Sequence, residues 1–472
     1  MNIFQLIRTG TLPVQKRTFL TAAATLLAGN LFAGDAGRAL YGCGANVHGE
    51  LCDGSASYYY ANTKMRDGVV RVASGYSHSL YIDGNGDLYA CGTNSQGELG
   101  NGTTTASLEP VFIAHNVRDA VCGTQSTFYL TSDDELHACG YNYSGQLGTG
   151  DKTSRSSPVL VASNVDSIAA GDHYLLVLDR NGVLSGVGRN QSGQLGNKDD
   201  LNDLTLWQTI ATNVTKIDAG NDTTLYLRSD GTLFGLGYNT YGQLGVETTY
   251  TWTADRIQIA TNVRDFCASG QAVFFIDNKN DLYGIGYNNG NYWGVGDSVV
   301  FTTTPVLIMG DVLKVASGPG SSHILVITKD HRLHSIGNNS DYQLGRTGGT
   351  TFDTWQDVDT NVVDACAVWN RSLYIKATGL SCYPPRAEKG PKFAAVGWVD
   401  DTYFPWVWSY ALGTWYYVYD GICADTAEGC WIFYYTSDFS DYGWGYLYPE
   451  TGWWCFKSDG SANWLYYGDP LP

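Results

Sequence analysis

Three histidines are the first residues to consider for chemistry, because imidazole binds metal ions and exchanges protons near neutral pH. His78, His173 and His323 each lie two residues before a leucine of a short apolar run, in non-adjacent copies of a repeated segment. A position that accepts alanine indicates a structural role, and histidines in separate repeats would lie too far apart to share an ion. We therefore expect no catalytic and no metal-binding residue here. The other copies fill this position with Ser126, Thr223, Ala272 and Arg371.

Cysteines offer no better case for a metal centre, since no pair has the C-x-x-C spacing of a zinc site. Cys43, Cys91 and Cys139 share one position of successive repeats that holds Val, Leu or Ile elsewhere. We interpret them as small core hydrophobes rather than ligands or bridges. No Ser-His-Asp set or carboxylate pair stands out either, so the sequence predicts a protein that is not an enzyme and needs no cofactor. Four further cysteines lie outside the repeats and could form disulfides after export, with the pairing left open: Cys382, Cys423, Cys430 and Cys455.

The elements that would position any site come from an internal repeat. "GYNYSGQLGTG" at 140–150 has close copies at 92–102, 188–196 and 237–245, and three weaker ones. The leucine that begins the strand before each copy recurs every 48 to 51 residues, seven times in all. Short β-branched and aromatic runs flank Asn85-Gly86 and Asn181-Gly182, which predicts hairpins with two-residue turns. A period near 50 residues has room for four short strands, which is one propeller blade.

The ends of the repeat array indicate how the ring closes. The array begins in the second half of a repeat, at Leu40, and stops after a first half, at Lys376. The two halves would complete one blade and leave no long free sheet edge. The sequence therefore predicts an all-β fold: a seven-bladed propeller over residues 37–380, with a small aromatic-rich β domain after it.

We interpret the repeated motif as structural rather than functional. Its glycines permit close approaches, its leucine fills a core position, and its Asn and Gln satisfy loop backbone groups. The residues that differ between repeats in this loop are more informative about function, because they include Tyr, Trp and Arg, which dominate protein interfaces. Equivalent loops share one side of a propeller, so these side chains are our candidate binding surface; the alternative is that they only pack over neighbouring loops. The candidates are Tyr141, Tyr143, Arg189, Tyr238, Tyr241, Tyr287, Tyr292 and Trp293.

Both ends of the chain differ from the repeats. Residues 1–36 combine basic residues, a short apolar run and small residues near Ala36, which is typical of a secretory leader. Residues 381–392 read as a linker, and residues 393–472 hold nine of the fourteen tryptophans. This tail predicts short aromatic hairpins. It could bind sugars or cell-wall groups, act as a sorting signal, or simply enclose its own core.

Together, "GYNYSGQLGTG" and "VASGYSHSLYIDGNGDLYACG" resemble the regulator of chromosome condensation repeat family, across about residues 40–376. The resemblance implies a seven-bladed binding platform, and the family's founder is a chromatin-bound nucleotide-exchange factor for a small GTPase. Here the net charge of −18 argues against binding nucleic acid. Secreted bacterial members of the family match this chain better. The tail resembles terminal modules of secreted bacterial proteins and, less closely, choline-binding repeats.

From these features we expect a secreted or cell-surface monomer without a transmembrane segment. Its propeller would bind a protein that the sequence does not identify, and its tail would contact the cell wall or a glycan. The alternative is an intracellular regulatory propeller that acts on a small GTPase as a guanine-nucleotide exchange factor. A glycan-cleaving enzyme would need carboxylates clustered around the channel, which the repeats do not provide.

Overall fold

The computed structural model describes residues 37–247, 251–288, 291–296 and 300–377, and the backbone of short strands between 399 and 466. The predicted leader at 1–36 and the linker at 381–392 lie outside the described residues, as do the side chains of the tail. Within the described part every regular element is a β-strand. The all-β prediction is therefore confirmed for the propeller.

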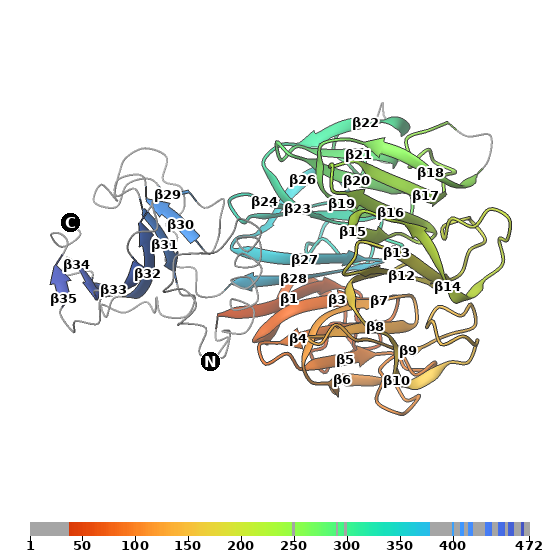
Figure 1. Ribbon diagram of the computed structural model, residues 1–472, viewed down its shortest axis with the longest axis horizontal. Coiled ribbons are helices and arrows are strands. Elements are labelled where there is room, and N and C mark those ends of the chain that lie inside the picture. The colour runs from red at the N-terminus through yellow and green to blue at the C-terminus, as the bar shows by residue number, and fades with distance from the viewer. Residues whose placement is uncertain are drawn as a thin grey trace, which may run out of the picture.

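Six blades are continuous in sequence, each a four-stranded antiparallel sheet (Figure 1). Blade 1 contains β3 (Val69–Ser74), β4 (His78–Asp83), β5 (Leu88–Gly92) and β6 (Ser107–Ala114). Blade 2 contains β7 (Val117–Cys122), β8 (Ser126–Thr131), β9 (Leu136–Gly140) and β10 (Arg155–Ala162). Blade 3 contains β11 (Val165–Ala170), β12 (Tyr174–Asp179), β13 (Leu184–Gly188) and β14 (Leu204–Ala211).

The next three blades repeat this order. Blade 4 contains β15 (Val214–Ala219), β16 (Thr223–Arg228), β17 (Leu233–Tyr238) and β18 (Trp252–Ala260). Blade 5 contains β19 (Val263–Ala268), β20 (Ala272–Asp277), β21 (Leu282–Tyr287) and β22 (Phe301–Met309). Blade 6 contains β23 (Val312–Ala316), β24 (His323–Thr328), β25 (Leu333–Asn338) and β26 (Thr351–Asp359).

The seventh blade, which we call the closing blade, joins the two ends of the array. Its strand order is β2-β1-β28-β27, with β1 (Arg38–Gly44) and β2 (Tyr59–Asp67) from the N-terminal side. The C-terminal side supplies β27 (Val362–Val368) and β28 (Arg371–Ala377). β1 pairs antiparallel with β28, and the two lie side by side in Figure 1. Because the first strands of all seven blades also contact one another in a ring, the predicted seven-bladed closure is confirmed.

Apolar side chains between neighbouring sheets form the core. In blade 1, Leu80, Leu88 and Leu99 pack against Val117 and Tyr129 of blade 2. Each of these leucines is 1% exposed or less. Because the alternating residues of a strand face opposite sides of its sheet, every blade is buried on both faces by its neighbours. Because this packing recurs in every repeat, the strands form a rigid support for the loops that connect them.

The hairpins between second and third strands differ from the predicted two-residue turns. The Gly86 N–H donates to the Asp83 carbonyl, and the Asp83 N–H donates to Asp87, so three residues connect the strands. Only Gly86 of this turn has positive φ, at 79°. Such a connection needs one left-handed residue rather than two. Other repeats accordingly place Asp134 or His331 at the equivalent position.

Strand direction divides the propeller's loops between two faces. First and third strands end on one face, which therefore carries both the loops between the first two strands and the long loops with the G-x-N-x-x-G-Q-L-G motif. We call this the loop face. The opposite face carries the short hairpins and the connections from one blade to the next.

The tail backbone forms its own seven-stranded antiparallel sheet, in which each strand pairs with the next in sequence. The strands are β29 (Val399–Asp400), β30 (Trp406–Ser409), β31 (Thr414–Val418), β32 (Cys430–Thr436), β33 (Tyr442–Tyr448), β34 (Gly452–Phe456) and β35 (Trp464–Tyr466). The pairing of Cys382, Cys423, Cys430 and Cys455 lies outside what the structure describes. The roles considered for the tail stay predictions.

Candidate functional site

Each motif loop is built around one buried asparagine. Asn142 Oδ1 accepts the Leu147 N–H at 2.9 Å, and its Nδ2 donates to the carbonyls of Asp151 and Thr153 at 3.0 and 3.1 Å. Gln146 Oε1 accepts the Ser144 N–H at 3.1 Å. Leu147 is fully buried in the core. The motif is therefore architecture, as predicted, and it holds the residue before the asparagine in a fixed place.

That preceding residue is attached to the neighbouring loop of the same blade. The backbone N–H groups of Tyr141, Arg189 and Tyr238 donate to the carbonyls of Gln125, His173 and Asp222, each at 2.9 Å. The same bond recurs in the other blades. It brings the two kinds of loop together on the loop face, where the variable side chains can meet.

Aromatic side chains of the motif loops form two groups on this face. In blade 2 the ring of Tyr141 lies 4.9 Å from that of Tyr143, which is 61% exposed, and 5.3 Å from that of His173 in blade 3. Farther around the ring, Tyr241 lies 6.2 Å from Tyr238 and 4.7 Å from Tyr287 of blade 5. These ring distances fall within the range of favourable aromatic contacts.

A charged pair bridges the two aromatic groups. Arg189 Nε of blade 3 lies 3.7 Å from Asp222 Oδ1 of blade 4. Gln194 Nε2 donates to the same oxygen at 2.8 Å, and the Asp222 carbonyl holds Tyr238. The whole set spans blades 2 to 5 without interruption. We call it the aromatic arc, which comprises Tyr141, Tyr143, His173, Arg189, Asp222, Tyr238, Tyr241 and Tyr287.

One predicted binding residue belongs to the core instead, and a second lies partly buried beside it. Trp293 is 1% exposed, and its backbone N–H donates to Asn288 Oδ1 at 2.8 Å, just as the backbone N–H of a motif leucine would. Its ring packs at 5.7 Å on Phe274. Tyr292 is partly buried against the same cluster. Trp293 therefore cannot contact a partner, because it replaces the leucine of the motif in this repeat.

Two of the three histidines are structural, as predicted. His78 Nε2 lies 3.1 Å from Thr127 Oγ1 in the next blade, and His323 Nε2 lies 2.9 Å from Ser372 Oγ. Both imidazoles are almost fully buried, and burial lowers the pKa of each to about 3. They are therefore neutral and act as hydrogen-bonding links between blades.

The prediction that His173 shares this position is wrong. Strand β12 begins at Tyr174, which pairs with Gly188 as His78 pairs with Gly92. His173 therefore lies one residue earlier, in the loop, and belongs to the aromatic arc. Its pKa is lowered by burial and by the charge of Arg189. Aligning Gly171 with Gly75, rather than leucine with leucine, would have found this.

The inner rim of the loop face carries acids that sequence reasoning missed. Asp172 accepts hydrogen bonds from Asn221 Nδ2 at 3.1 Å and from Thr124 Oγ1 at 3.3 Å. Burial raises the pKa of Asp172 and of Asp222. The arc is thus aromatic with an acidic inner border, and Arg189 supplies its one guanidinium.

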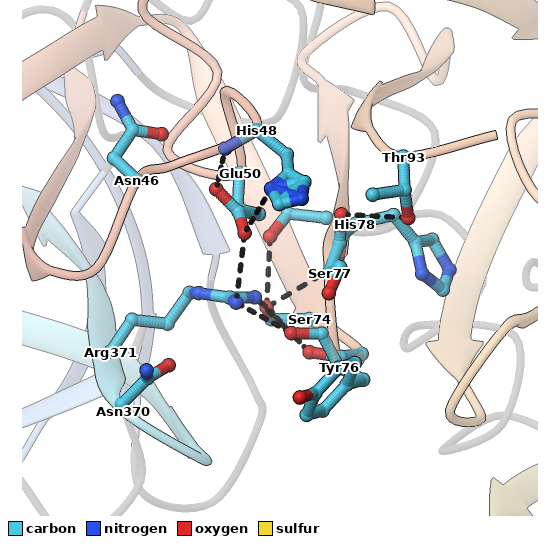
Figure 2. Close-up of polar contacts among 12 residues, drawn as sticks. Asn46, His48, Glu50, Ser74, Tyr76, Ser77, His78, Thr93, Asn370 and Arg371 are labelled. Carbon is cyan, nitrogen blue, oxygen red and sulfur yellow. Dashed lines mark hydrogen bonds and ion pairs between the residues drawn. The ribbon is translucent and has the colours of Figure 1, made fainter. Parts of the chain in front are cut away.

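A buried ion pair closes the ring on the same face (Figure 2). Arg371 Nη2 lies 3.4 Å from Glu50 Oε1, and both side chains are under 5% exposed. Nη2 donates to the Tyr76 carbonyl at 2.6 Å, and Nη1 donates to Ser74 Oγ at 2.9 Å. The guanidinium therefore ties the C-terminal strand β28 to an N-terminal loop and to blade 1, which is a role in closure rather than chemistry.

A disulfide reinforces that junction and corrects one prediction. Cys91 on β5 is bonded to Cys52 of the closing blade, with Cα atoms 5.5 Å apart. Cys91 is therefore a bridge, whereas Cys43 and Cys139 are free and buried, as expected of core residues. The sequence feature that could have predicted this disulfide is Cys52, which replaces the last glycine of the motif in "GELC".

Among residues 37–377 that the structure describes, no group of three or more His, Cys, Asp or Glu side chains is arranged to hold a metal ion. In the same part of the chain, no helix is long and apolar enough to span a membrane. The arc offers aromatic faces, hydrogen-bonding groups and charge.

Comparison with known proteins agrees with this architecture. The family model of the RCC1-like domain matches residues 39–379. The chain is similar to yeast RCC1 (Prp20) in its complex with Kap60, with a TM-score of 0.66 and 18% identity over 72% of this chain and 89% of that one. It is similar to Prp20p from Saccharomyces cerevisiae, with a TM-score of 0.64 and 17% identity over 72% and 92% of the two chains.

Human WBSCR16 is also similar, with a TM-score of 0.64 and 19% identity over 73% of this chain and 99% of that one. At such identities the likeness shows the fold alone. No curated protein sequence matches the chain.

Proposed function

Because the chain belongs to the RCC1-like domain family, we propose that it is a non-catalytic, regulatory propeller that binds a protein partner through the aromatic arc. The observation that carries the proposal is the continuity of the arc across four blades. Its exposed and half-buried tyrosines sit on a rigid frame, so little side-chain entropy is lost on binding. Tyr and Arg are also the residues that contribute most to protein interfaces.

The test compares partners captured from extracts of the producing organism by the wild-type protein and by two single variants, Tyr141→Ala and Tyr238→Ala. We expect each variant to stay folded and to lose at least tenfold of one shared partner. Tyr60→Ala is the matched control, because Tyr60 is 53% exposed but belongs to the closing blade, outside the arc. Equal capture by all four proteins would contradict the proposal.

Guanine-nucleotide exchange on a small GTPase is the second candidate function. It is favoured by family membership and by the yeast relative Prp20p, which is described for its binding to Gsp1p and histones. The assay follows release of fluorescent GDP from Gsp1p with and without this protein. Accelerated release that Tyr238→Ala abolishes would establish exchange, whereas an unchanged rate would leave binding without exchange.

Export and attachment by the tail are a further part of the proposal. The disulfide between Cys52 and Cys91 supports an oxidising compartment, since disulfides rarely persist in the cytosol. N-terminal sequencing of the natural protein should find a mature chain that starts near Gly37. Washed cell envelopes should then sediment residues 37–472 but not residues 37–380. Sedimentation of both would assign attachment to the propeller instead.

A further inference from the structure

The junction between blade 6 and the closing blade places two tyrosines at a right angle on the loop face. The ring of Tyr60, at the start of β2, lies 4.4 Å from that of Tyr342, in the motif loop of blade 6, and the ring planes meet at 83°. Tyr60 is 53% exposed, and Tyr342 is half-buried. We call this pair the aromatic corner. It lies outside the aromatic arc, which ends at blade 5.

Tyr342 takes the place of a glycine of the motif. Its N–H donates to the Asn339 carbonyl at 3.0 Å, as the Gly145 N–H donates to the Asn142 carbonyl. Its φ of 65° lies in the left-handed region, where a bulky side chain is strained. Blade 5 has Asn291 at this position, a residue type that tolerates such a backbone. Since glycine would serve the loop better, the tyrosine side chain points to a function. The other five loops have glycine here: Gly49, Gly97, Gly145, Gly193 and Gly242.

The residue that Tyr342 contacts is equally unusual. A Cβ built on any of those five glycines would lie under 3.0 Å from a residue near the start of the next blade's fourth strand. In the closing blade, Tyr60 occupies the corresponding place on β2. None of the five residues in the other blades is aromatic, so the packing of the repeat does not require an aromatic pair. These residues are Leu108, Ser156, Thr205, Ala254 and Thr303.

The rings of the corner are not covered by a cation of the chain. Five other aromatic rings of the propeller lie under an arginine or lysine, at 4.7 to 5.8 Å. Among the described residues, no such cation lies over Tyr60 or Tyr342. The arginine of the same motif loop, Arg346, is engaged elsewhere: its Nη1 donates to Gln356 Oε1 at 2.6 Å, and its guanidinium lies over Phe352 at 5.5 Å. Both rings of the corner are therefore free to receive a cation from outside.

A carboxylate beside the corner also lacks a cation. Asp341 directly precedes Tyr342, and its Oδ2 accepts a hydrogen bond from Asn370 Nδ2 at 3.3 Å. No Lys, Arg or His of the described residues forms an ion pair with Asp341. Burial raises the pKa of Tyr58, which is 38% exposed, and the charge of Asp341 adds to this shift. The corner is thus bordered by a negative charge that the described residues do not neutralise.

We propose that the aromatic corner binds a quaternary ammonium group, such as that of choline or of a trimethylated lysine side chain. Perpendicular rings allow the methyl groups of such a cation to contact both tyrosines, whose faces attract positive charge. A primary ammonium is strongly hydrated and would lose water at this site without new hydrogen bonds, whereas a quaternary ammonium has no N–H to satisfy. Asp341 adds a longer-range attraction. The inference does not depend on the arc.

The experiment labels the full-length protein with 3-fluorotyrosine and follows the fluorine signals of Tyr60 and Tyr342, assigned from their loss in Tyr60→Phe and Tyr342→Phe. Choline is the probe, and 3,3-dimethylbutanol is its uncharged counterpart of the same shape. At constant ionic strength, choline should shift both signals saturably, and the alcohol should bind about tenfold more weakly. Because the signals belong to the corner, a probe that binds elsewhere in the chain is not counted. Phosphocholine and N-acetyl-trimethyllysine amide, titrated separately, then distinguish the two sources of the cation by their affinities.

Tyr342→Gly is the decisive variant, because it restores the residue of the repeat and should stay folded. Read from the signal of Tyr60, it should bind choline about tenfold more weakly. Tyr60→Ala, read from the signal of Tyr342, repeats the test at an exposed position. Tyr143→Ala is the matched control, since Tyr143 is a 61% exposed tyrosine of another motif loop on the same face, and it should leave the titration unchanged.

The proposal is overturned if choline and the alcohol bind equally, if choline shifts neither signal, or if Tyr342→Gly and Tyr60→Ala bind choline like the wild type. Corner and arc fail separately. Tyr60→Ala should lose choline binding and still capture the partner of the arc, whereas Tyr238→Ala should lose that partner and still bind choline.

Discussion

Replacing Cys52 with glycine should remove the ring-closing disulfide while restoring the repeat's own residue. Cys52 has a φ of 61°, and the equivalent Gly100 has a φ of 64°. A Cβ placed on Gly100 would lie 3.0 Å from Cys139 Sγ in the next blade. The last glycine of the motif therefore contacts the residue that corresponds to Cys91, and a cysteine there is positioned to form the bridge.

The size of the effect follows from the chain that the bridge encloses. A sequence separation of 39 residues corresponds to about 4 kcal/mol of loop-closure entropy in the unfolded chain. In Cys52→Gly, a glycine replaces a non-glycine residue in the left-handed region. This replacement recovers about 1 kcal/mol of the free energy of unfolding. We therefore expect a net loss of about 3 kcal/mol in the free energy of unfolding under non-reducing conditions.

Urea unfolding with and without dithiothreitol provides the assay. Reductant should destabilise the wild type by about 4 kcal/mol and leave Cys52→Gly unchanged. Cys139→Ala is the control, since Cys139 is a free thiol at the same position of the next repeat. The reasoning fails if reductant does not affect the wild type, or if it affects Cys52→Gly equally.

Three further predictions test the electrostatics and packing of the propeller by urea unfolding. Arg371→Met leaves Glu50 buried without its partner and should cost about 3–5 kcal/mol, part of which the double variant with Glu50→Gln recovers; full stability of the single variant would refute the closure role. Burial raises the pKa of Asp218 to about 6. Since the folded state then binds the proton more tightly than the unfolded chain, stability falls as pH rises from about 4 to about 6. Asp218→Asn should therefore stabilise the protein by at most about 3 kcal/mol at pH 7 and have no effect below pH 4, and an equal effect at both pH values would contradict this. Trp293→Leu restores the leucine of the motif and should cost less than Trp293→Ala, for which about 3–5 kcal/mol is expected; equal losses would show that leucine cannot take the place of Trp293 in this blade.

The ring of blades could be predicted from sequence because spacing and the two half-repeats determine it. Residues within one blade were harder to place. His173 was misplaced because leucines occur at two adjacent positions in "HYLLVLD", and only the pairing of Tyr174 with Gly188 decides between them. Trp293 was taken for a surface residue because composition does not distinguish an aromatic in a loop from one that fills a core position.

The arc itself could be predicted only in part. Its tyrosines follow from variation before the motif asparagine, since equivalent loops share a face. Its acidic member Asp222 and the neighbouring Asp172 come from different loops that approach only when neighbouring blades dock. Such contacts between repeats cannot be predicted from the sequence of either repeat alone. Comparing equivalent positions across blades would have exposed them, as it exposes Cys52.

Equivalent positions also show why seven similar blades dock without like charges meeting. The third residue of each first strand is charged in six blades: positive at Arg71, Lys216 and Lys314, and negative at Asp119, Asp265 and Asp364. Two neighbouring pairs are direct ion pairs, Lys216 with Asp265 and Lys314 with Asp364.

Around the ring these charges alternate in sign. Seven is odd, however, so strict alternation would force one pair of like charges together, which costs free energy in a partly buried setting. The seventh position is neutral, and it lies between Asp119 and Lys216: Ser167. The uncharged residue falls in blade 3, which also contributes His173 and Arg189 to the arc. No charged residue at this position therefore has a neighbour of the same sign, and the neutral Ser167 spares the ring the repulsion that a seventh charge would cause.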